Sequence, residues 1–269
     1  MPAPLQAEII DGIKTFIPLE NNPEVLKLLC ENLQISPDLD FHDIVSAAPE
    51  VLHACPQFRP CHALIVLADH PIYKVARPAA VESTIPVYKG SGPDEPVLWM
   101  KQTIGHACGL MALLHVVFNL EGGRYVQAQF APGTVTNTGT STRTAIAALR
   151  QQAIPLAPTD RAQLLYDSRL LEEAHMDAAS RGSSTAPSPR EYVHHHFLAF
   201  VKKDDGEVWE LNGDINGPVL RGVLGDGEDL LSERGLELTV NGFLGAAGET
   251  GCYEMSIVAV TGGDVVARG

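Results

Sequence analysis

Cys108 differs from the other four cysteines because glycines stand at positions 105 and 109 and a long apolar segment begins beside it. Residues 107–120 (ACGLMALLHVVFNL) predict a helix that is apolar on nearly every side and therefore belongs in a core. A helix N-terminus favours the nucleophilic thiolate, and its unpaired N–H groups can bind a developing oxyanion. The alternative is a small core residue at the start of a buried helix.

A thiolate mechanism also needs an imidazole and a group that orients it. Three histidines adjoin at 194–196, and His196 leads into a predicted hairpin with strands over 197–203 and 207–212. We expect His196 and Asn212 to lie roughly opposite each other, at neighbouring positions across this hairpin, so that the Asn212 carboxamide oxygen can accept from the ring. The alternatives are a solvated strand edge or an adventitious metal site for the histidines, and a turn for Asn212-Gly213.

Gln102 stands six residues before Cys108 and could supply a second oxyanion donor through its side-chain amide. The alternative is an ordinary surface glutamine. No Asp, Glu or Cys stands at a convincing ligand spacing from the histidines, so we expect neither a metal nor another cofactor.

The remaining elements mix strands and helices without regular βαβ alternation, which indicates an α+β fold. The pattern predicts helices over 23–33, 41–47, 143–151, 160–176 and 230–244, and strands over 14–20, 62–68 and 252–260, with a further possible strand at 85–88. Pro and Gly predict loop over most of 69–96, and small polar residues predict a long loop from residue 177.

Composition bounds the class of protein. The 269 residues, 45% of them hydrophobic, suffice for one large domain or two small ones. A net charge of −14 argues against nucleic acid, and it fits a basic partner or plain solubility. An odd count of five cysteines without a CxxC argues against a disulfide framework or a zinc-thiolate site. With no secretory signal and no long apolar run, we expect the cytoplasm, and also the nucleus, as the compartment.

Four segments together resemble the motifs of the ubiquitin C-terminal hydrolases, a family of papain-like cysteine deubiquitinases. Residues 102–109 (QTIGHACG) resemble the nucleophile motif, in which Gln precedes Cys by six residues. Residues 196–201 (HFLAFV) resemble the histidine strand, and 206–213 (GEVWELNG), continued by 217–219, resemble the third motif. Residues 16–25 are similar to the family's opening, and the resemblance runs from about 10 to 262.

This resemblance implies a single catalytic domain over 1–269, with its core at about 10–262. It implies a central antiparallel sheet flanked by helices, a threaded, knotted chain, and a crossover loop at about 177–193 that limits the leaving group to small adducts. The activity implied is thiol-dependent hydrolysis of amide, ester or thioester bonds at the C-terminal glycine of ubiquitin. The catalytic residues implied are Cys108, His196, Asn212 and Gln102. Ubiquitin is the implied partner, and we expect a monomer that binds neither nucleic acid nor membrane.

Two residues depart from the family pattern, which usually has Asp at the position of Asn212 and Asn at that of His106. A cysteine site tolerates asparagine, because its imidazole can work with an amide oxygen, so we expect an active but slower enzyme. Asp214 could substitute for the missing charge, although we expect it to face the next turn. His106 could compete for Cys108, although we expect it to pack at the helix start.

Two other functions stay open. Asn212 and His106 could mark a catalytically weakened or inactive ubiquitin-binding pseudo-enzyme. The chain could also hydrolyse a ubiquitin-like modifier such as Nedd8.

Overall fold

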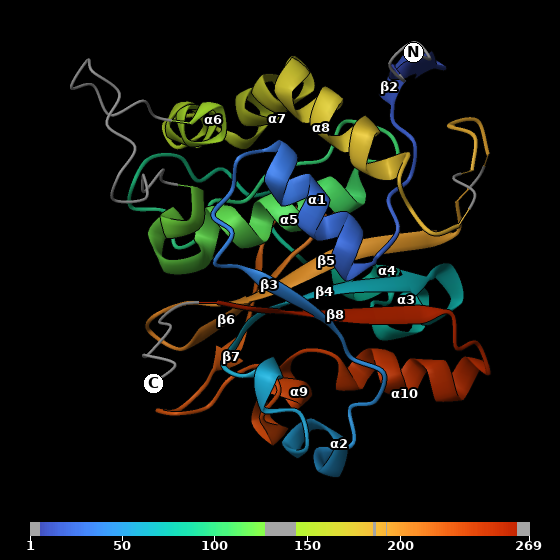
Figure 1. Cartoon of the computed structure of the whole chain (residues 1–269), viewed down its shortest axis with the longest axis vertical. Helices are drawn as coiled ribbons and strands as arrows, with labels where there is room; N and C mark the ends of the chain where they lie inside the picture. Colours follow the sequence, from blue (N-terminus) through green and yellow to red (C-terminus); the bar gives the residue numbers. More distant parts are fainter. Residues whose placement is uncertain (1–5, 127–143, 185–186, 192, 263–269) are drawn as a thin grey trace.

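A computed structural model describes residues 6–126, 144–184, 187–191 and 193–262 (Figure 1). It is an α+β fold built on a six-stranded sheet in which every pair of neighbouring strands is antiparallel. This architecture confirms the predicted fold class. In spatial order the strands are β3 (Asp40–Asp43), β8 (Met255–Thr261), β4 (Cys61–Asp69), β5 (His195–Lys202), β6 (Glu207–Leu211) and β7 (Val219–Val223). A separate hairpin joins β1 (Glu8–Ile10) to β2 (Ile13–Thr15).

Helices cover both faces of the sheet (Figure 1). One face packs against α1 (Pro23–Asn32), α5 (Cys108–Asn119), α6 (Ala145–Ala153), α7 (Pro158–Tyr166) and α8 (Arg169–Ala179). The other packs against α2 (Pro49–His53), α3 (His70–Ala76), α9 (Glu233–Leu238) and α10 (Asn241–Thr250), while α4 (Ala79–Glu82) follows α3. Two short 3₁₀ segments lie at η1 (Pro56–Phe58) and η2 (Leu120–Val126).

Strand β5 shows how the sheet divides the core. Phe197 and Ala199 belong to the hydrophobic cluster on the α5 side, whereas Leu198 and Phe200 belong to the cluster on the α10 side. Because successive strand residues point to opposite faces, a strand buried on both faces reads as a continuous apolar run rather than as an alternation. The apolar run at 62–68, which lies in β4, has the same cause.

Helix α5 begins at Cys108, and every residue from Gly109 to Phe118 is buried. Its first turn carries no side-chain cap, because Ala107 stands at the capping position. The backbone N–H groups at this end are therefore left to other partners. Among the helices of the described ranges, none is long and apolar enough to cross a bilayer.

Several predicted elements were wrong or misplaced. The predicted helix at 41–47 is instead the short edge strand β3, whose buried Phe41 pairs with Val260. The predicted loop at 69–96 contains α3 and α4. Its Pro71 stands in the first turn of α3, where proline is tolerated. No strand forms at 85–88.

Three further boundaries differ. The predicted helix over 160–176 is divided into α7 and α8, because the Ser168 side chain caps a new helix by accepting from the Leu171 N–H. The predicted helix over 230–244 is likewise divided into α9 and α10. Because α8 continues to Ala179, the loop predicted at 177–193 begins later than predicted.

Candidate active site

One pocket brings together residues that lie far apart in the sequence. Cys108 at the start of α5, His196 in β5 and Gln102 in the segment before α5 all line it. Asn212, the residue after β6, is 1% exposed and contacts His196. The structure thus gathers all four residues that the sequence singled out.

The His196 ring is held by Asn212. Its Nε2 atom lies 3.0 Å from the Asn212 Oδ1 atom. The strand register pairs Ala199 with Leu211, so its continuation places Asn212 opposite Leu198 and not opposite His196. The predicted contact between the ring and the carboxamide oxygen therefore forms, and it is made on the diagonal, two residues from direct opposition.

Two backbone hydrogen bonds fix the position of the segment before α5. The Gln102 N–H donates to the Gly213 carbonyl at 2.9 Å, which fixes Gln102 beside the residue that follows Asn212. A Cβ on Gly213 would lie 3.0 Å from both the Gln102 nitrogen and the Met100 oxygen, so a side chain fits poorly there. Further along, the Phe16 N–H donates to the Gly105 carbonyl at 2.9 Å and ties the segment to the chain after β2.

Burial dominates the electrostatics of the Cys108 thiol. Burial raises the pKa of Cys108, while backbone N–H groups of Phe197, Gly109 and Cys108 itself act in the opposite direction. The N–H groups of Cys108 and Gly109 have the effect that a helix start predicts, and Phe197 in β5 adds to it, but desolvation outweighs all three. Burial also lowers the pKa of His196, against the charge of Asp214 and the Asn212 hydrogen bond. Both shifts favour a neutral thiol and a neutral imidazole.

Comparison with known proteins places this site in a family. The chain matches the family described as ubiquitin carboxyl-terminal hydrolase, family 1, over residues 16–241. It is 34% identical over 208 residues to a ubiquitin carboxyl-terminal hydrolase of Aplysia californica, covering 77% of this chain and 86% of that one. The chain belongs to the ubiquitin carboxyl-terminal hydrolase family.

Other relatives agree. A probable ubiquitin carboxyl-terminal hydrolase of Dictyostelium discoideum is 32% identical over 213 residues, covering 77% of this chain and 74% of that one. The catalytic domain of Trichinella spiralis UCH37, solved bound to ubiquitin vinyl methyl ester, shares the fold with a TM-score of 0.61 at 17% identity, covering 92% of this chain and 96% of that one. Membership makes the chain a cysteine-type hydrolase of the deubiquitinase class.

Asp214 lies closer to the chemistry of this hydrolase than we expected. It lines the pocket with Cys108 and His196 and does not simply face the next turn. Its backbone N–H donates to the Asn212 Oδ1 atom at 2.9 Å. Its carboxylate raises the pKa values of both the His196 ring and the Cys108 thiol, opposing burial at the first and adding to it at the second.

His106 also lines the pocket. It adopts a left-handed conformation, with φ 57°, that histidine tolerates better than most non-glycine residues. Burial lowers its pKa, against a hydrogen bond to the Phe16 backbone. Its Nδ1 is buried and makes no hydrogen bond to the part of the chain that the structure describes.

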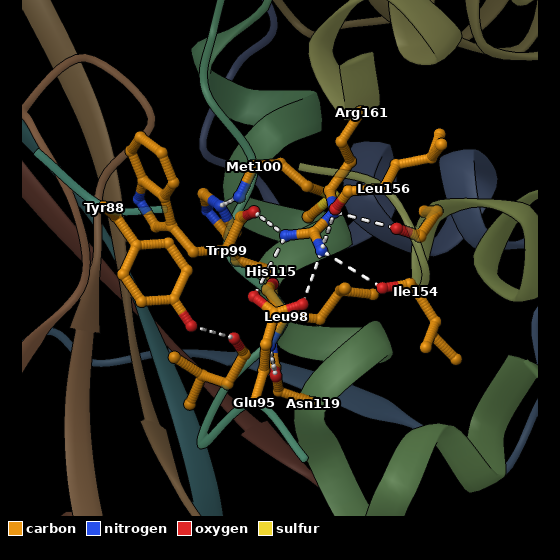
Figure 2. Close-up of polar contacts among 12 residues, drawn as sticks. Tyr88, Glu95, Leu98, Trp99, Met100, His115, Asn119, Ile154, Leu156 and Arg161 are labelled. Atoms are coloured by element: carbon orange, nitrogen blue, oxygen red, sulfur yellow. Dashed lines mark hydrogen bonds and ion pairs between the residues drawn. The ribbon is translucent and has the colours of Figure 1, made fainter. Parts of the chain in front are cut away.

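A buried polar network around Arg161 and Trp99 lies behind the site (Figure 2) and reaches the backbone of Asn212. The Trp99 indole N–H donates to the Asn212 carbonyl at 3.0 Å, and the Trp99 carbonyl accepts from Arg161 at 2.5 Å. Arg161 forms an ion pair with Glu95 at 2.6 Å and also donates to the carbonyls of Ala153, Ile154 and Leu156. Sequence reasoning missed Trp99, Arg161 and Glu95, because nothing in their local pattern separates them from ordinary core and surface residues.

Glu20 connects the pocket to the predicted crossover loop. Its carboxylate accepts the N–H groups of Ser183 at 3.0 Å and Ser184 at 2.6 Å, and also both hydroxyls. Burial raises the pKa of Glu20, but the bonds from Ser184 and Ser183 outweigh it and leave this pKa lowered. Ser184, Pro187 and Val193 line the pocket, so the described part of the loop lies beside the site.

Proposed function

We propose that this hydrolase cleaves amide, ester or thioester bonds at the C-terminal glycine of ubiquitin. Cys108 gives its proton to His196, and its sulfur attacks the carbonyl carbon. The Cys108 N–H and the Gln102 amide stabilise the oxyanion, and His196 protonates the leaving amine as the thioester forms. Water then loses a proton to His196 and hydrolyses the thioester, which restores the thiol and frees the ubiquitin carboxylate.

The observation that most supports this proposal is the His196–Asn212 hydrogen bond beside Cys108. With Nε2 occupied by Asn212, the other ring nitrogen is available to exchange a proton with the thiol. Because burial favours a neutral Cys108 thiol and a neutral His196 ring, the proton must pass from the thiol to the ring as the sulfur attacks the substrate carbonyl. Asn212 orients the ring by presenting its oxygen, as in the Cys-His-Asn arrangement of papain-like proteases.

We also propose a preference for small leaving groups. Ser184, Pro187 and Val193 line the pocket, and Glu20 binds the backbone of Ser183 and Ser184, so a bulky adduct would have to displace this described part of the loop. Comparing a ubiquitin amide of a small fluorophore with ubiquitin linked to a folded domain tests this. Equal kcat/KM values for the two would contradict the proposal.

A ubiquitin propargylamide probe and a fluorogenic ubiquitin amide test the activity, with Cys108→Ala as the control. We expect one adduct per chain, formed at Cys108, and turnover well above the control. No labelling and no turnover would favour the ubiquitin-binding pseudo-enzyme. A Nedd8 probe that reacts faster than the ubiquitin probe would instead assign the activity to that modifier.

Residence in the cytoplasm and nucleus and a monomeric state are further proposals, supported by the free cysteines and the acidic composition. Cell fractionation and size-exclusion chromatography test them. A secreted pool, or elution at twice the mass of 28.9 kDa, would contradict them.

A further inference from the structure

The orientation of the Asn212 amide follows from its hydrogen bonds. The Asp214 backbone N–H donates to it at 2.9 Å, and because that N–H cannot accept, the atom facing it must be Oδ1. The same oxygen lies 3.0 Å from the His196 Nε2 atom, which must therefore carry a hydrogen. In the neutral ring, Nδ1 is then the nitrogen that can receive a proton.

The Asn212 amide nitrogen is held by Tyr73 in α3. It donates to the Tyr73 hydroxyl at 2.9 Å, so the phenol must donate its own hydrogen elsewhere. That hydrogen goes to a carboxylate oxygen of Glu82, the last residue of α4. Burial, the hydrogen bond to Glu82 and the charges of Glu82, Glu210 and Asp214 raise the pKa of Tyr73 far above its usual range, so the phenol keeps its hydrogen.

Tyr73 also contacts the histidine itself. Its ring packs edge-on against the His196 ring, with the centroids 4.8 Å apart. One side chain therefore touches both the ring and the amide that orients it. Because Asn212 is 1% exposed, water cannot readily replace a lost partner of its amide.

We propose that Tyr73 and Glu82 are positioning residues that act with the Asp214 N–H to hold the Asn212 oxygen toward His196 and so favour the Nε2–H form of the ring. The site is therefore built for asparagine and not for aspartate. An aspartate at 212 would present an acceptor where Tyr73 now receives a donor. The phenol hydrogen could satisfy that carboxylate or Glu82 but not both, and two like charges would share the site.

The first arm of the test removes the Tyr73 hydroxyl, and it rests on the proposed function because it needs turnover. In Tyr73→Phe, hydrolysis of a fluorogenic ubiquitin amide should lose about tenfold in kcat, as expected for one unsatisfied buried donor, with KM within about twofold. Tyr125→Phe is the matched control. It removes a comparable buried hydrogen bond, from Tyr125 to Glu121 at 3.0 Å, and should leave kcat unchanged.

The second arm replaces the Asn212 amide donor that faces Tyr73 with a carboxylate acceptor. Asn212→Asp should lower kcat below wild type, and adding Glu82→Gln should recover part of the loss. The glutamine amide can donate to the Tyr73 oxygen, which frees the phenol hydrogen for the new carboxylate. A merely structural role predicts no such recovery. An Asn212→Asp enzyme as fast as wild type, or a double variant no faster than Asn212→Asp, would overturn the proposal.

The third arm needs no substrate. Nitrogen-15 NMR of the His196 ring should show the Nε2–H form in wild type and in Tyr125→Phe, and a mixed population in Tyr73→Phe. An unchanged ring spectrum in Tyr73→Phe would overturn the proposal even if that variant were less stable. A wild type without turnover above Cys108→Ala would count against the proposed function alone, because the ring spectrum still judges the positioning role.

Discussion

Replacing Arg161 with methionine should destabilise the protein far more than the loss of a surface charge. Arg161 is 0% exposed and its partner Glu95 is 5% exposed, so the pair lies away from solvent. Breaking a buried pair from one side leaves an uncompensated charge, at a cost of about 3–5 kcal/mol of unfolding free energy. Adding Glu95→Gln removes the stranded charge, so the double variant should be more stable than Arg161→Met alone.

Urea unfolding, followed by tryptophan fluorescence, measures these free energies. Arg234→Met is the matched control, because Arg234 and Glu237 form an exposed pair at 3.0 Å whose loss should change stability by less than about 1 kcal/mol. Under native conditions Arg161→Met should also lower kcat, since Trp99 holds the Asn212 carbonyl. A loss for Arg161→Met no larger than for Arg234→Met, or a double variant less stable than Arg161→Met, would refute the reasoning.

Three further outcomes are expected at the site. Gly213→Ala should lose about 1–3 kcal/mol of stability and most of its kcat, because the new methyl group would press on the Gln102 backbone. The control is Gly248→Ala, which lies in open space on α10 and should be neutral or stabilising in the same unfolding and activity assays. Asp214→Asn should move the acid limb of the kcat/KM profile to lower pH, because the carboxylate raises the His196 pKa. Protonated His196 cannot accept a proton, so the limb follows this pKa, and an unmoved limb would contradict the prediction. Glu20→Gln should speed tryptic cleavage within 181–193 several-fold at neutral pH, and equal cleavage rates for the two proteins would count against the anchor. In wild type the bonds from Ser184 and Ser183 lower the Glu20 pKa, so the same release should need a pH below the ordinary range of a glutamate carboxyl.

Much of the fold could be predicted from the sequence where complete burial gives an element a long apolar run. Helix α5 and strands β4 and β5 are strongly apolar, and they were placed within one or two residues. The start of α8 and the whole of α3 were missed because single capping residues, Ser168 and Asp69, set where these helices begin. Strand β3 was missed because four residues are too few to show a period.

The candidate site was predictable in its residues but not in its surroundings. Cys108, His196, Asn212 and Gln102 carry motifs, and they meet in one place. Tyr73, Trp99 and Arg161 carry no local signal, because their importance comes from contacts over more than sixty residues of sequence separation. The direction of the Cys108 pKa was likewise beyond prediction, since it depends on burial that only the folded chain defines.

The position of β8 in the sheet determines when the sheet can be completed as the chain is synthesised on the ribosome. β8 (Met255–Thr261) lies between β3 and β4, although it is the last strand in the described part of the chain. Until it emerges, β4 keeps one long edge of unpaired backbone groups beside a strongly apolar face, which is a template for aggregation. A chain that stops before residue 255 would carry all four proposed catalytic residues yet lack the strand that completes its sheet. Synthesis must therefore pass residue 261 before the sheet that carries the site can be completed.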